Sequence, residues 1–66
     1  MAETVTFYDA TVVVSREKAL LVELDDGEEV WFPRSQIEYG ETDIEEEGDT
    51  GTIEVTMWIA EQKGLR

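Results

Sequence analysis

The segment Asp25-Asp26-Gly27 constrains the fold more than any other feature of the chain. An Asp-Gly pair between two apolar runs is typical of a tight β-hairpin, and here the runs are residues 19–24 and 28–33. The chain therefore contains two adjacent antiparallel strands, and the rest of the fold has to be built around them.

The register of this hairpin follows from the side chains that it segregates. A two-residue loop would pair Leu21 with Phe32 and leave both faces mixed. A three-residue loop with Gly27 in the left-handed conformation separates the faces, at the cost of placing Glu23 opposite Glu29. We predict this second register, which collects one apolar face from Leu20, Val22, Leu24, Val30 and Phe32.

Other segments predict three further strands. Residues 5–8 and 10–14 place their apolar side chains in opposite phases, which indicates one strand region with a bend or bulge near Asp9. Residues 37–39 and 52–56 have the composition of short strands. We therefore predict a mainly β single domain over residues 1–66, either a small five-stranded antiparallel sheet or an SH3-like or OB-like barrel, with a short C-terminal helix.

The C-terminal segment 57–63 can form about two helical turns. Gly64 stands where a left-handed helix terminator is expected, and Leu65 can fold back onto the helix. The outer face of the hairpin carries Leu21 across from Trp31, so an apolar cover is needed there. We expect this helix to be that cover, with a partner protein as the alternative.

Composition excludes several classes of function. The 66 residues contain no cysteine and no histidine, so disulfides, thiolate metal sites and imidazole catalysis are excluded. The N-terminus lacks the pattern of a signal peptide, and no apolar run approaches the length of a membrane span. We predict a cytoplasmic, non-enzymatic protein with no cofactor, no metal and no membrane association.

The charge is the dominant chemical property. Seventeen acidic residues against five basic ones give a net charge of −12, which disfavours direct contact with DNA phosphates. A solubilising surface and adaptation to a salty cytoplasm are two explanations, but the acids cluster between Glu38 and Asp49. We predict a partner-binding segment there, with Tyr39 and Ile44 as apolar anchors and with charge from Glu38, Glu41, Asp43, Glu45, Glu46, Glu47 and Asp49.

Two other interpretations involve the same regions. Residues Asp43 to Glu54 partly match a calcium-binding loop, although Glu and Thr replace the usual residues at several positions. A secondary surface of Leu21, Trp31 and Arg34 can be imagined to stack and bind single-stranded nucleic acid, which the neighbouring acids oppose. Pairing of exposed strand edges into a homodimer is a further expectation.

The chain also resembles a known group of proteins. Its motifs are Lys18-Ala19-Leu20-Leu21-Val22, the segment 26–31, Pro33-Arg34-Ser35-Gln36-Ile37 and the C-terminal segment 58–65. They resemble a family of small uncharacterised proteins that are frequent in bacteriophages and prophages. This family has no assigned activity, so the resemblance implies no catalytic residue. Thr56-Met57 stands where relatives tend to have a proline and an acid.

These observations lead to three hypotheses of function. The first is an acidic interaction module of phage origin that imitates DNA, as some anti-CRISPR proteins do, and blocks a basic nucleic-acid-binding surface on a host protein. The second is an accessory module of phage replication or recombination that contacts single-stranded nucleic acid. The third is a structural or scaffold domain with a solubilising acidic surface.

Overall fold

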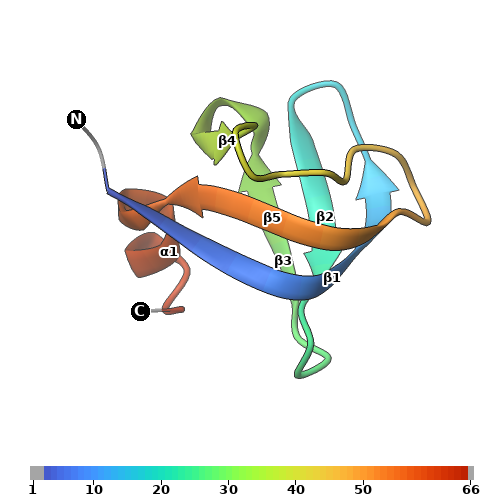
Figure 1. Cartoon of the computed structure of the whole chain (residues 1–66), viewed down its shortest axis with the longest axis horizontal. Helices are drawn as coiled ribbons and strands as arrows, with labels where there is room; N and C mark the ends of the chain where they lie inside the picture. Colours follow the sequence, from blue (N-terminus) through green and yellow to red (C-terminus); the bar gives the residue numbers. More distant parts are fainter. Residues whose placement is uncertain (1–2, 66) are drawn as a thin grey trace.

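The computed structural model describes residues 3–65 and shows a mainly β protein (Figure 1). Met1 and Ala2, part of the segment on which the signal-peptide prediction rests, lie outside the described residues, as does Arg66. The elements in chain order are β1 (Thr4–Ser15), β2 (Ala19–Glu23), β3 (Glu29–Pro33), the 3-10 helix η1 (Arg34–Gln36), β4 (Ile37–Glu38), β5 (Thr50–Thr56) and α1 (Met57–Gln62).

The strands form one antiparallel sheet in the order β3-β2-β1-β5-β4. The prediction of a five-stranded antiparallel sheet with a short C-terminal helix is therefore confirmed. The sheet does not close, because β3 and β4 are its two edges, so the alternative of a barrel is not confirmed.

The β2–β3 hairpin has the predicted register. Leu20 pairs with Phe32 and Val22 with Val30, and Gly27 has a φ of 88° in the three-residue loop. Glycine adopts this left-handed conformation without a steric penalty, because it has no Cβ. The apolar face predicted for this hairpin is buried, while Glu23 and Glu29 face each other in solvent.

Strand β1 is bent by two irregularities. Its pairing with β5 shifts between Phe7 and Ala10, where Asp9 has a φ of 58°, and this confirms the predicted bulge. A second shift, between Val12 and Val14 in the pairing with β2, was not predicted. The bends allow one long strand to pair with β5 along its first half and with β2 along its second half, so the sheet curls around its core.

The helix α1 ends at the expected glycine and begins at a capping residue, Thr56, that was not predicted. The Thr56 hydroxyl accepts the backbone N–H of Ile59 at 3.2 Å, so Thr56 caps the first turn of the helix. Gly64 has a φ of 74°, and the Leu65 N–H returns to the carbonyl of Ala60 at 2.8 Å. Ile59 and Ala60 are buried in the core, and Leu65 packs against it.

The prediction that α1 covers the outer face of the hairpin is wrong. The helix follows β5 without a connecting loop, so it packs against β1 and β5 and not over β2 and β3. Trp31 consequently remains 41% exposed beside the half-buried Leu21. Within residues 3–65, no helix has the length and apolar character needed to cross a bilayer.

Candidate functional site

The acidic loop, residues 38–49, is attached to the sheet at several points. The Gly48 N–H donates to the carbonyl of Val12, and the Val12 N–H donates to the carbonyl of Asp49, both at 2.8 Å. The Asp43 N–H donates to the carbonyl of Thr52 at 3.1 Å. The loop is therefore held against β1 and β5 by backbone hydrogen bonds as well as by its covalent ends.

Ile44 is the apolar anchor of the loop itself, and its prediction as an exposed contact for a partner is wrong. Its side chain is only 1% exposed and belongs to the core. It is the one aliphatic side chain between Glu38 and Asp49, and its burial gives this segment hydrophobic stabilisation. Tyr39, the second predicted anchor, is 49% exposed.

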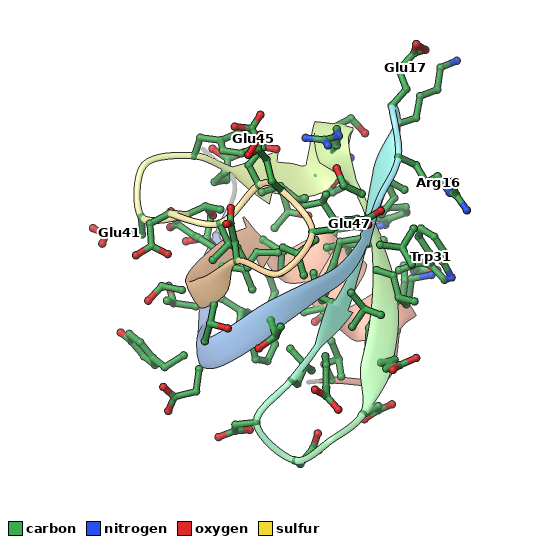
Figure 2. All side chains as sticks on the ribbon, turned by 90° about the vertical axis from the view of Figure 1, so that its right-hand side faces the viewer. Arg16, Glu17, Trp31, Glu41, Glu45 and Glu47 are labelled. Carbon is green, nitrogen blue, oxygen red and sulfur yellow. The ribbon has the colours of Figure 1, made fainter. Side chains whose placement is uncertain are left out.

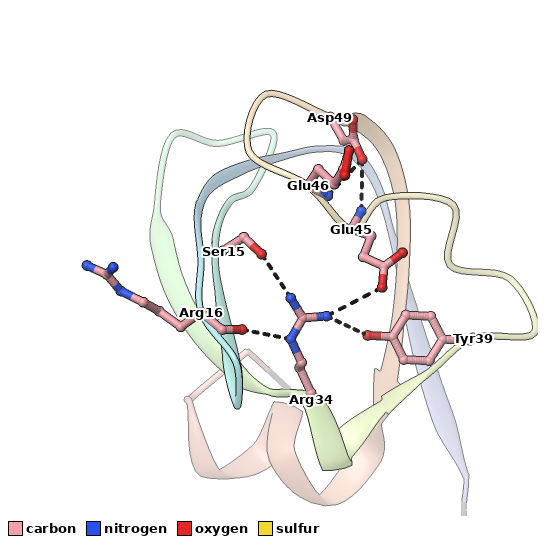
Figure 3. Close-up of polar contacts among 7 residues, drawn as sticks. All are labelled: Ser15, Arg16, Arg34, Tyr39, Glu45, Glu46 and Asp49. Atoms are coloured by element: carbon pink, nitrogen blue, oxygen red, sulfur yellow. Dashed lines mark hydrogen bonds and ion pairs between the residues drawn. The ribbon is translucent and has the colours of Figure 1, made fainter.

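The carboxylate of Asp49 stabilises the turn formed by residues 45–49. Its Oδ2 accepts the backbone N–H of Glu46 at 2.9 Å and that of Glu45 at 3.0 Å (Figure 3). These two bonds, that from Glu46 first, lower the pKa of Asp49 from its ordinary value of 3.8, because they favour the ionised carboxylate. Asp49 therefore acts in shaping the loop.

Two further acids of the loop also bind backbone groups. Asp43 Oδ1 accepts the N–H of Thr52 at 2.8 Å, and Glu47 Oε2 accepts the N–H of Ser15 at 3.1 Å. These carboxylates hold the loop to β5 and to the end of β1. Together with Glu45 and Asp49, four acids of the loop thus have internal partners. The sequence pattern did not distinguish these four acids from the other acids of the loop.

Thr42 was not selected by sequence reasoning, yet it joins the loop to β5. Its hydroxyl donates to the carbonyl of Glu38 at 2.6 Å and accepts the N–H of Glu54 at 2.7 Å. The available signal was a threonine close to a glycine turn, where such side chains often bond to the backbone.

Arg34 connects the acidic loop to the turn between β1 and β2. Its Nε donates to the carbonyl of Arg16 and its Nη2 to the hydroxyl of Ser15, both at 2.8 Å (Figure 3). Its Nη1 lies 3.5 Å from the Tyr39 hydroxyl and 3.8 Å from Glu45 Oε1.

The Arg34 side chain is 25% exposed, and these contacts direct its donors toward the protein. The predicted role of Arg34 as a phosphate contact beside Trp31 loses support, because a guanidinium already bonded in this way has few free donors for phosphate.

The remaining acids of the loop are left without a counter-charge. The side chains of Glu38, Glu41 and Glu46 are exposed, and none forms a hydrogen bond or ion pair within residues 3–65. The single ion pair within residues 3–65 joins Arg34 and Glu45. Figure 2 shows carboxylates projecting from the acidic loop around Glu41 and Glu45.

The arrangement does not gather the carboxylates around one point. The calcium-like pattern runs from Asp43 in the loop to Glu54 in β5, and Glu54 accepts the hydroxyl of Thr4 at 2.6 Å and the N–H of Glu41 at 3.3 Å. Residues 3–65 contain no group of three or more acids placed to hold a metal ion, and they enclose no pocket.

The fold and this surface define a class of protein: a small, strongly acidic, mainly β protein with a structurally fixed acidic loop. Comparisons of the chain with protein-family models, curated proteins and solved structures give no match.

Proposed function

We propose that this protein is a non-enzymatic, cytoplasmic interaction module that binds a basic, nucleic-acid-binding surface of a host protein through the acidic loop. It acts as a DNA mimic, in the manner of anti-CRISPR-type inhibitors, by steric and electrostatic competition with nucleic acid. The resemblance to bacteriophage and prophage proteins supports a viral origin.

The observation that carries this proposal is that one segment combines an ordered backbone with acidic side chains that have no counter-charge. Asp43, Glu47 and Asp49 bind backbone N–H groups and fix the loop, while Glu38, Glu41 and Glu46 remain exposed without a cation. A preordered loop loses little conformational entropy when it binds, which favours affinity. Unpaired charges attract a positive surface over long range and increase the association rate.

Mutual repulsion among these acids is unfavourable in the free protein. A basic partner would relieve this repulsion on binding, whereas a solubilising coat requires no ordered loop. Tyr39 lies within the same surface and is half exposed, so it supplies the apolar contact that a specific interface needs at its centre.

The test compares two triple variants of equal charge. The first reverses Glu38, Glu41 and Glu46 to Lys. The control reverses Glu17, Glu28 and Glu61, which are exposed acids outside the acidic loop, so both variants change the net charge of −12 by the same amount. Each is immobilised and exposed to a nuclease-treated bacterial lysate, and the captured proteins are identified.

We expect the wild type and the control variant to capture the same nucleic-acid-binding protein and the loop variant to lose it. The captured protein is then purified and titrated with duplex DNA, which the wild-type chain should displace. Equal capture by both triple variants, or a stable complex of the partner with DNA and this chain together, would contradict the proposal.

A further inference from the structure

A second surface lies on the outer face of the β2–β3 hairpin, whose turn Figure 1 shows at the opposite end of the molecule from the segment between β4 and β5. Three apolar side chains are direct partners across three strands there: Val14 of β1, Leu21 of β2 and Trp31 of β3. Val14 and Leu21 are half-buried and Trp31 is exposed. These three residues, the apolar row, form a continuous strip on the outer face of the sheet that ends at the edge strand β3.

The backbone of β3 is open at the same place. Hydrogen-bonded and non-hydrogen-bonded pairs alternate in an antiparallel ladder. The Leu24 N–H donates to the carbonyl of Glu28 and the Arg34 N–H to that of Lys18, both at 2.8 Å, and this fixes the phase of the alternation.

In this phase, Leu20–Phe32 and Val22–Val30 are the hydrogen-bonded pairs of β2 and β3. Glu29 and Trp31 therefore direct their N–H and C=O groups away from β2. Within residues 3–65 no strand pairs with this edge of β3. Pro33, which has no N–H, ends the run of free donors.

The charges beside the apolar row select the kind of partner. The neighbouring row contains Glu23 and Glu29, opposite each other and exposed, and no basic side chain pairs with either of them within residues 3–65. A second copy of this chain would bring its own negative charge of −12 to the same edge. An extended segment that carries Lys or Arg would instead relieve the repulsion of the glutamate pair.

We propose that the outer edge of β3 binds an extended, basic segment of a partner protein as an added strand. The open backbone groups of Glu29 and Trp31 supply the hydrogen bonds, and side chains on the outer face supply the selectivity. An apolar side chain of the partner packs on Trp31 and Leu21. A Lys or Arg two residues away lies on the same face, because side chains alternate along a strand, and it pairs with Glu29 and Glu23.

This inference does not depend on the function proposed for the acidic loop. It predicts a spacing, since the apolar and basic side chains of the bound segment must be separated by one residue. The test uses a fluorescent peptide, Ser-Thr-Lys-Thr-Val-Thr-Lys-Thr-Ser, which has this spacing in both chain directions. The control peptide exchanges each Lys with the Thr beside Val, so it keeps the composition but places the Lys side chains on the opposite face.

We expect the first peptide to bind about tenfold more tightly than the control in an anisotropy titration. Glu29→Lys and Trp31→Ala should each weaken its binding about tenfold. The matched control variants are Glu61→Lys and Trp58→Ala, which change an exposed acid and an exposed Trp on α1 and should leave binding unchanged.

Hydrogen exchange gives a second readout that requires no variant. The amide protons of Glu29 and Trp31 should exchange slowly only when the first peptide is present. Equal binding of both peptides would overturn the proposal, as would loss of binding on reversal of Glu41 and Glu46 in the acidic loop. A dimer of the chain alone in sedimentation, with both amides already protected, would assign the edge to a second copy and would also overturn it.

Discussion

Glu38 on β4 and Glu54 on β5 are direct cross-strand partners with no cation beside either of them within residues 3–65. Glu54 is half-buried and accepts hydrogen bonds from Thr4 and Glu41, so it is fixed in place, whereas Glu38 is exposed. Like charges directly opposite each other destabilise a sheet. The fold therefore tolerates repulsion at the point where β4 joins the sheet.

Replacing Glu38 by Lys should stabilise the protein. The substitution removes the repulsion and creates an attractive pair with Glu54, which together should raise the free energy of unfolding by about 0.5–1 kcal/mol. Urea denaturation followed by Trp fluorescence measures this change. Glu38→Gln should give about half of the gain, because it removes the repulsion without adding an attraction, and a loss of stability in either variant would contradict the argument.

Gly51→Ala should destabilise the protein because there is no room for the added methyl group. A Cβ on Gly51 would collide with the carboxylate of Asp43, which accepts the Thr52 N–H at 2.8 Å and cannot move without losing that bond. We expect a loss of about 1–3 kcal/mol in the free energy of unfolding.

The matched control is Gly40→Ala, whose new methyl group would meet its nearest neighbour, Glu54 Oε1, at an ordinary contact distance of 3.7 Å. This variant should be close to the wild type. The double variant Gly51→Ala, Asp43→Ala should lose less stability than the two single variants added together, since the collision is then absent. Additive losses would show that the close approach is not the cause.

The predictable part of this fold is the part encoded locally. Gly27 and the alternation around it determine the hairpin register without reference to the rest of the chain, and Gly64 marks the end of α1. The N-cap Thr56 is an equally local signal, although it was not predicted. The packing site of α1 was not predictable in the same way. It depends on the length of the connection to β5 and on the curl of β1. The second bulge of β1 contains no turn-forming residue from which it could have been predicted.

The acidic loop was predictable as a segment, but the structural roles of its individual residues were not. Clustering of acids located the acidic loop, yet Ile44 was assigned to the surface because it is a lone apolar residue in a polar run. Arg34 was considered as a phosphate contact because it closely follows Trp31, whereas its main partners, Ser15 and Arg16, are distant in sequence. Such roles arise from tertiary contacts, which a linear pattern does not contain.

Arg34 should therefore contribute more to stability than its single long ion pair suggests. Arg34→Met removes the hydrogen bonds to Ser15 and to the carbonyl of Arg16, and we expect a loss of about 1–2 kcal/mol in thermal or urea unfolding. Glu45→Gln alters only the 3.8 Å ion pair with an exposed carboxylate, so it should change stability by about 0.5 kcal/mol or less. An equal effect of the two substitutions would mean that the ion pair, and not the hydrogen bonding, is what Arg34 contributes.

Asp49 should make the stability of the acidic loop dependent on pH. Its pKa is lower in the folded protein than the ordinary 3.8, so between these two values the unfolded chain binds more protons and stability rises with pH. The stabilisation by Asp49 is therefore complete above 3.8 and is lost as the pH falls through the lowered folded-state pKa.

The measurement is the difference in unfolding free energy between the wild type and Asp49→Asn at a series of pH values. This difference should be constant near neutral pH and should shrink toward zero in acid. Asp25→Asn removes the same charge from the exposed hairpin loop, where its carboxylate has no bond within residues 3–65, and it corrects for the general effect of net charge. A difference that grows on acidification, or an Asp49 pKa at or above 3.8 in a carboxyl NMR titration, would show that the bonds from Glu46 and Glu45 do not stabilise the ionised form.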